Sequence, residues 1–108
     1  MKESQAIDAL GALAHEVRLK IVRYLVTCGD DGSSAGGIGN KVGAAPSKVS
    51  FHIAALERAG LVDSQKVSRQ IIYRINFSVV GELLAYVMAD CCNNNDEILS
   101  CCNVKLCC

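Results

Sequence analysis

Residues 44–62 read AAPSKVSFHIAALERAGLV, and they form the most organised stretch of the chain. Pro46 suits the first position of a helix, where its missing N–H is not needed. Apolar side chains then recur at the i, i+4, i+7 spacing of a buried helical stripe, at Val49, Ile53 and Leu56. Gly60 stands where the residue beyond a helix C-terminus takes a left-handed backbone. The stretch therefore predicts a helix that begins at Pro46 and ends just before Gly60.

The residues that follow this helix predict a β-hairpin. Residues 61–67 form the first strand and residues 69–77 the second, in which apolar and polar side chains alternate. Ser68, Arg69 and Gln70 are the expected turn. The hairpin therefore has a polar and basic tip.

Two helices and a loop are expected on the N-terminal side of the central helix. Residues 4–14 and residues 16–27 carry apolar side chains at helical spacing. Residues 28–37, CGDDGSSAGG, form a loop by their Gly, Asp and Ser content. Ser33 or Ser34 then caps a short helix that precedes the central one.

Beyond the hairpin, the sequence predicts a long helix and a short one. Ser78 is the expected cap of the long helix, which carries an unbroken apolar stripe. The stripe consists of Val80, Leu83, Leu84, Val87, Met88 and Cys91. Residues 93–95, all asparagine, end this helix, and Asn95 or Asp96 caps the last short one.

A helix pair followed by a hairpin is the winged helix-turn-helix arrangement, an α+β fold that is mostly α. Such a fold places the second helix of its pair in a major groove of DNA and its hairpin tip on the backbone or in the minor groove. Hydroxyls, cations and an aromatic edge are side chains that can reach base edges or phosphates. The expected DNA-binding residues are Ser47, Lys48, Ser50, Phe51 and His52 on the helix, with Lys66, Arg69, Gln70 and Arg74 on the hairpin.

Size and charge agree with one such domain. The chain has 108 residues, of which 51% are hydrophobic, and its formal net charge is zero. Residues 41–74 hold six basic and two acidic side chains, a net of +4, whereas residues 78–108 hold four acidic and one basic, a net of −3. A basic middle segment can face phosphate while an acidic end stays away from it. No apolar run approaches the roughly 20 residues that cross a membrane, and the N-terminus lacks the apolar core of a signal peptide, so a cytoplasmic location is expected.

The cysteines gather at one end of the chain. Of seven, only Cys28 lies in the first 90 residues, and the other six form adjacent pairs at 91–92, 101–102 and 107–108. A disulfide framework would be spread along the chain that it holds, so clustered thiols in a reducing compartment indicate metal binding or redox chemistry. Thiolates are soft ligands that suit Cu(I), Zn and As(III), of which As(III) takes three sulfurs and zinc prefers four ligands. Six thiols can satisfy either, and reversible disulfide formation by oxidants is a further alternative.

Three segments together resemble the ArsR/SmtB family of metal-responsive repressors. ALAHEVRLKIVRYL (12–25) is similar to the family's second helix, APSKVSFHIAALERAGLV (45–62) to its recognition helix, and VDSQKVSRQIIYRIN (62–76) to its wing. The resemblance covers roughly residues 5–90. It implies that Ser47, Ser50 and Phe51 face bases and that Arg69 lies on the wing.

The resemblance also points to the C-terminal thiols as the sensor site. Some members of that family carry Cys-x-Cys before the recognition helix, where residues 35–38 of this chain have no thiol, and others use His on the last helix, which here has none. Some arsenic-responsive members have a vicinal pair at the end of the last helix and a third cysteine beyond it. Cys91, Cys92 and then Cys101 or Cys102 match that description. The resemblance therefore implies As(III) as the inducer, with Sb(III) as an alternative.

These interpretations combine into one hypothesis. Residues 1–92 form a winged helix-turn-helix domain that binds double-stranded operator DNA as a homodimer through its first and last helices, and residues 93–108 form a cysteine-rich sensor tail. Adjacent helical residues point about 100° apart, so Cys91 and Cys92 can hold one atom only where the helix ends or distorts. The alternatives are a repressor that senses Cd, Pb, Zn, Cu(I) or oxidants, and a thiol-rich metal-binding protein. No nucleophile lies in a recognisable catalytic motif, so an enzyme is not expected.

Overall fold

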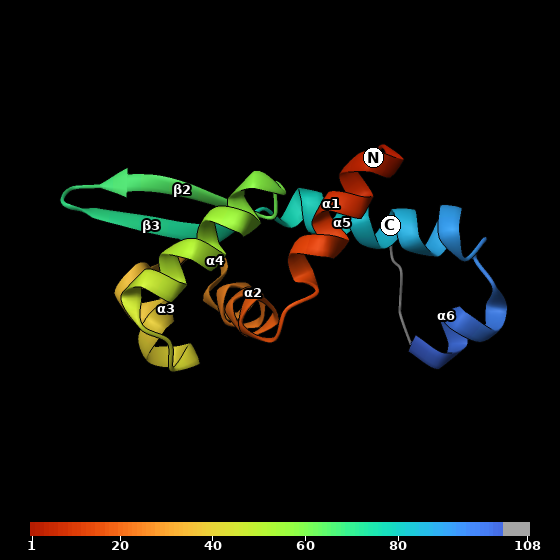
Figure 1. The fold of residues 1–108 in the computed structure, drawn as a ribbon. Coiled ribbons are helices and arrows are strands. Elements are labelled where there is room, and N and C mark those ends of the chain that lie inside the picture. Colours follow the sequence, from red (N-terminus) through yellow and green to blue (C-terminus); the bar gives the residue numbers. More distant parts are fainter. Residues whose placement is uncertain (103–108) are drawn as a thin grey trace.

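The structure, a computed structural model, describes residues 1–102, without the side chains of Cys101 and Cys102. Its helices are α1 (Glu3–Leu13), α2 (Glu16–Cys28), α3 (Ala35–Val42), α4 (Pro46–Arg58), α5 (Phe77–Tyr86) and α6 (Asp96–Cys102). Two short turns, the 3-10 turn η1 (Gly29–Asp31) and the π-helical turn η2 (Val87–Cys91), follow α2 and α5. The strands are β1 (Ser33–Ser34), β2 (Val62–Val67) and β3 (Gln70–Ile75). The expected α+β winged helix-turn-helix is confirmed (Figure 1).

The sheet contains one strand more than the hairpin that the sequence predicts. Its order is β1-β3-β2, and both neighbouring pairs are antiparallel. The hairpin register runs from Val62 opposite Ile75 to Val67 opposite Gln70. On the other edge of β3, Ser33 lies opposite Tyr73, within the segment that was expected to be a loop. The expectation that residues 28–37 form only a loop was therefore wrong. A strand of two residues is too short to produce an alternating pattern in the sequence.

The helix ends are set by local side-chain and backbone bonds. The Oγ atom of Ser34 accepts from the Gly37 N–H at 3.2 Å, which confirms the expected cap of α3. At the end of α4, Gly60 has φ +81°, and the N–H groups of Gly60 and Leu61 donate to the carbonyls of Glu57 and Leu56. This is the Schellman pattern that glycine permits at that position.

Two caps near the C-terminus are also settled. Ser78 does not cap α5, which corrects the sequence prediction. The Oδ1 atom of Asn76 accepts from the Val79 N–H at 3.2 Å instead, and α5 begins at Phe77, two residues earlier than a cap at Ser78 implies. Asn95 caps α6 by accepting from the Glu97 N–H at 2.9 Å. Asn93 and Asn94 adopt φ +51° and +50°, a left-handed backbone that asparagine tolerates. The asparagine run therefore ends the helix as expected.

The core lies where α4 meets α1, α2, α3 and the base of the hairpin. The expected inward stripe of α4 is confirmed, because Val49, Ile53 and Leu56 are at most 1% exposed. The other large buried side chains come from the surrounding elements and are Ile21, Leu25, Ile38, Leu61 and Val62. Burying each such side chain contributes roughly 1.5–3 kcal/mol. This packing fixes which face of α4 remains outside.

The predicted apolar stripe of the last helix divides into two parts. Leu83 is 3% exposed and belongs to the core of this chain, whereas Leu84 is 56% exposed. The helix is also not regular to its end, because η2 widens the last turn so that the Cys92 N–H donates to the Val87 carbonyl. Figure 1 shows η2 and α6 at the opposite end of the molecule from the tip of the β2–β3 hairpin. The molecule measures 47 × 25 × 23 Å, so the thiol-bearing end and the wing are far apart.

Candidate DNA-binding surface and thiol cluster

The outward face of α4 presents four of the five residues that the sequence predicts to contact DNA. Ser47, Lys48, Ser50 and Phe51 are all exposed. Phe51 is 61% exposed, the largest fraction among the exposed large apolar side chains of residues 1–100. These four side chains therefore lie on the side of α4 that is left outside the core, where the sequence predicts the DNA contacts.

His52 is the fifth predicted residue, and the structure corrects that prediction. Its side chain is 6% exposed, because it lies one position beyond Phe51 and turns toward α2. Its Nδ1 atom accepts a hydrogen bond from the Arg18 Nε–H at 3.1 Å, and its ring centroid lies 4.4 Å from that of His15. Burial, followed by the charges of His15, Arg18 and Lys48, lowers the pKa of His52 below its usual 6.5. His52 therefore supports α4 from behind and has too little surface to read a base.

Arg18 is a part of this surface that sequence reasoning missed. Its guanidinium carbon lies 5.8 Å from the centroid of the Phe51 ring, within the range of a cation–π contact. Arg18 is on α2 and its two partners are on α4, more than thirty positions along the chain. No local pattern marks such a contact, and only the folded arrangement of α2 and α4 reveals it.

The wing places its predicted residues in two different environments. Lys66, Arg69 and Gln70 are exposed around the hairpin tip, where Ser68 turns the chain with φ +58°. Arg74 is only half exposed, because its Nε–H donates to the Asp30 carbonyl at 2.6 Å and its Nη1 donates to Gln65 at 2.7 Å. A guanidinium has five N–H donors, so Arg74 can still reach a phosphate while it holds η1 against the sheet.

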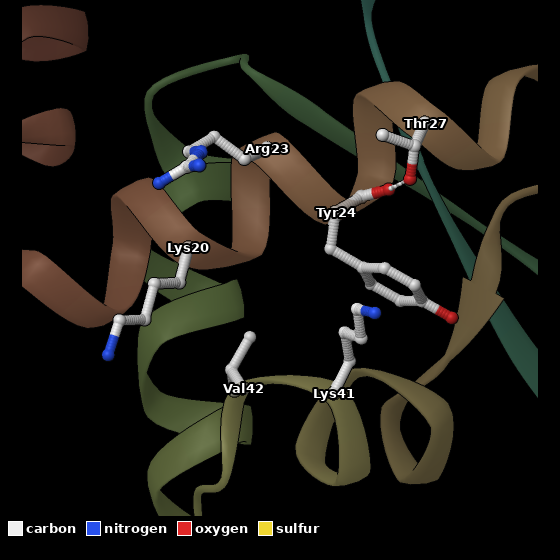
Figure 2. Close-up of a pocket in the computed structure, with 6 residues that line it drawn as sticks. All are labelled: Lys20, Arg23, Tyr24, Thr27, Lys41 and Val42. Atoms are coloured by element: carbon white, nitrogen blue, oxygen red, sulfur yellow. Dashed lines mark hydrogen bonds between the residues drawn. The ribbon is translucent and has the colours of Figure 1, made fainter.

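A basic cleft of about 440 Å³ lies between α2 and α3. It is lined by Lys20, Arg23, Tyr24, Thr27, Lys41 and Val42, with no acidic residue among them. Figure 2 shows that the charged ends of Lys20, Arg23 and Lys41 point in different directions. Lys20 is also paired with Glu16 at 3.3 Å. The cleft adds positive potential to the domain, but its cations do not converge as a discrete anion site requires.

The predicted thiol ligands lie at the junction of η2 and α6. Cys91 is exposed and Cys92 is half-buried, and both are free thiols. The third ligand was predicted at Cys101 or Cys102, whose side chains lie outside the described residues, as do Cys107 and Cys108. Within the described part of the chain, no three His, Cys, Asp or Glu side chains are grouped closely enough to hold a metal ion. The structure thus places the vicinal pair at a widened helix end and leaves the full ligand set a prediction.

Comparison with known proteins places the chain in a family. Residues 13–65 match a helix-turn-helix domain family. The chain is 36% identical over 81 residues to the HTH-type transcriptional regulator YgaV of Escherichia coli K12, covering 75% of this chain and 80% of YgaV. The chain belongs to the ArsR family of helix-turn-helix transcriptional regulators. This is a family of DNA-binding regulators and not of enzymes.

Solved structures of ArsR-like proteins have the same fold. An ArsR-like regulator from Rhodococcus sp. RHA1 superimposes with a TM-score of 0.73 at 22% identity, covering 94% of this chain and 93% of that one. The homodimeric winged helix-turn-helix domain Mb0332 of Mycobacterium bovis, described as a possible ArsR-family regulator, superimposes with a TM-score of 0.67 at 27% identity, covering 81% and 80%. Among residues 1–102 no helix has the length and apolar character needed to cross a membrane.

Proposed function

We propose that this ArsR-family protein is a repressor that binds operator DNA as a homodimer and leaves it when As(III) binds Cys91, Cys92 and one of Cys101 or Cys102. The observation that carries the proposal is the π-helical end of the last core helix, which terminates at the vicinal thiols. Regular helical geometry keeps adjacent side chains about 100° apart. A helix that widens and then stops at Cys91 removes that restriction where two thiolates must converge on one atom.

The chemistry of the thiols favours a soft acceptor with three bonds. Cys91 is exposed, so an incoming arsenite can reach it without prior unfolding. Soft thiolates select soft acceptors over hard cations. A vicinal pair with one further thiol supplies three sulfurs, which is the number that a pyramidal As(III) needs. Zinc would require a fourth ligand.

Exposed apolar side chains on the first and last core helices support a homodimer. Ile7 and Leu10 on α1 are 60% and 45% exposed, and Leu84 on α5 is 56% exposed. Large apolar side chains gathered in this way are stabilised when a partner covers them. The related Mb0332 domain is a homodimer by its description. The proposed interface therefore uses Leu84 rather than the buried Leu83.

A sensor at this helix end can act on the dimer, because the two share an element. Cys91 lies seven positions after Leu84 along the same continuous helical segment. That segment also lies against α1, because α5 and α1 are in contact. A ligand that pulls on η2 would shift the segment that sets the distance between the two recognition helices. Binding at the thiols would in this way be coupled to binding of DNA, through the helical segment that both sites share.

The test is release of operator DNA by arsenite from variants that keep the fold. Cys91→Ser and Cys92→Ser are expected to bind the operator like the parent protein and to stay bound at arsenite concentrations that release the parent. Cys28→Ser, which changes a half-buried thiol at the end of α2, is the matched control and should respond normally. X-ray absorption of the arsenic complex should show sulfur neighbours only.

Parallel titrations separate the proposal from its rivals. Antimonite, cadmium, lead, zinc, Cu(I) and peroxide are added to the same protein–DNA complex. Release by peroxide but not by arsenite would replace the proposal with an oxidant sensor that forms a disulfide. Release by cadmium, lead, zinc or Cu(I) alone would make the protein a sensor of that metal. Failure to bind any promoter DNA would leave a thiol-rich metal-binding protein.

A further inference from the structure

Arg18 contacts two neighbouring side chains of the recognition helix from outside it. Its Nε–H donates to the Nδ1 atom of His52 at 3.1 Å, and its guanidinium lies 5.8 Å from the centroid of the Phe51 ring. The rings of Phe51 and His52 meet edge to face, with centroids 5.3 Å apart and an interplanar angle of 73°. The exposed Phe51 therefore contacts two side chains, Arg18 and the buried His52, that are also bonded to each other.

We propose that Arg18 is a positioning residue for DNA recognition: together with His52 it fixes the Phe51 ring so that the ring reads the methyl group of a thymine in the major groove. This inference rests on the proposed operator binding through α4. It adds Arg18 to the recognition machinery and assigns His52 a role behind the helix face.

The exposed side of Phe51 decides which feature of DNA it can recognise. A phenyl ring has no hydrogen-bond donor or acceptor, so it cannot read the polar edges of guanine, cytosine or adenine. The 5-methyl group of thymine is the apolar group that a major groove offers. A ring with fixed orientation also loses less conformational entropy on binding than a free one. Phe51 at the front of α4 is therefore suited to thymine.

The neutral state of His52 is needed because its Nδ1 atom is an acceptor. A protonated ring would carry a hydrogen on Nδ1 and would face the Arg18 N–H with a second donor. The charged and titratable groups that act on His52 are His15 just before α2, Arg18 of α2 and Lys48 of α4, all of them basic. On the far side of Arg18, Asp8 of α1 and Arg58 of α4 line a shallow hollow with it. Burial and the basic neighbours lower the pKa of His52, so the neutral ring is the resting state near pH 7.

Lowering the pH therefore weakens the arrangement. Because the pKa of His52 is below that of an unfolded histidine, the folded protein binds fewer protons than the unfolded chain in the interval between the two values. The stabilisation is complete above about pH 6.5 and is lost as the pH falls through the lowered pKa. Thymine recognition should decline over the same interval.

The experiment replaces each thymine of a selected operator duplex by uracil, which removes only the 5-methyl group. For the parent protein, uracil at one position of one half-site should weaken binding about three- to fivefold, the effect expected for the loss of one buried methyl group. Phe51→Ala and Arg18→Met should bind thymine and uracil duplexes equally well at that position. Arg23→Met, which removes an exposed arginine from the same helix, is the control and should keep the discrimination.

A second readout separates positioning from mere structural support. The parent protein should lose the thymine preference as the pH falls from about 6.5 through the lowered pKa of His52, whereas His52→Asn, which keeps an acceptor oxygen near the Nδ1 position, should keep it throughout. If Arg18→Met folds poorly, Phe51→Ala decides the question, because residue 51 is 61% exposed, so its replacement leaves the core intact while it removes the ring that contacts the methyl group. Equal uracil sensitivity in the parent and the Phe51 variant would overturn the inference. Operator release by arsenite in the same samples would then show that only this inference, and not the proposed function, had failed.

Discussion

Gly32 is the residue at which the fold leaves no room for a side chain. It has φ +64°, and a Cβ atom there would meet the carbonyl oxygen of Tyr73 and the side chain of Arg74. We expect Gly32→Ala to destabilise the protein by about 1–2 kcal/mol through the left-handed backbone, and by more through the clash with β3. Thermal unfolding measures the effect. Gly36→Ala is the control, because position 36 is helical, exposed and free of close contacts, so alanine should raise the stability by about 0.5–1 kcal/mol. Equal midpoints for the two variants would contradict the close approach of β1 to β3.

At the residue scale, the sequence predicted a residue's role correctly where that role depends on neighbours a few positions along the chain. Pro46 at the start of α4, Gly60 at its end and Ser34 before α3 each act within four positions along the chain, and their roles were predicted. The role of His52 was predicted wrongly, because it depends on Arg18, which only tertiary packing brings within 3.1 Å. A histidine on the front turns of a recognition helix looks like a base contact until the helix behind it is in place.

The wing is the element whose contribution to binding can be isolated by one substitution. Arg69 lies in the turn between β2 and β3, and the hairpin projects away from the body of the molecule (Figure 1). We expect Arg69→Ala to weaken DNA binding about equally for all operator sequences and to reduce the slope of log K against log salt by about 1, because one phosphate or minor-groove contact is lost. Gel shifts at several salt concentrations test this. An unchanged affinity and slope would show that the wing does not contact DNA.

The last core helix shows where periodicity stops being informative at the element scale. The predicted stripe correctly marks α5 as apolar on one side, but a 3.6-residue period cannot say whether a leucine meets its own chain or a second one. Leu83 and Leu84 are adjacent, yet one is 3% and the other 56% exposed. The π-helical turn at Val87–Cys91 was likewise absent from the prediction, which allowed only that the helix must end or distort at the vicinal thiols.

On the scale of the whole molecule, the arrangement separates the proposed DNA-binding surface from the proposed thiol sensor. The recognition helix and wing lie toward one end and η2 with α6 at the other, along a long axis of 47 Å (Figure 1). The winged helix-turn-helix order was predictable, because each element has a local period and the elements follow in sequence. The ligand set and the dimer were predictable only as hypotheses, since they depend on Cys101 or Cys102 and on a second chain.

The dimer supplies the last prediction, because the operator must be held by two recognition helices about 34 Å apart. Leu84→Glu places a carboxylate on a side chain that is 56% exposed in one chain, so the protomer should remain folded while the proposed interface is lost. Sedimentation should then show a monomer, and operator affinity should fall by about 10²–10⁴, because the second half-site is no longer tethered. Leu19→Glu is the matched control: Leu19 is 48% exposed on α2, outside the proposed interface, and this variant should stay dimeric and bind DNA. Leu83→Glu, in contrast, should unfold the protomer, because it buries a charge in the core of a single chain. If the Leu84→Glu protein sediments as a dimer and binds its operator normally, α5 is not part of the interface. A ligand on Cys91 and Cys92 would then have no route through α5 by which to move the recognition helices.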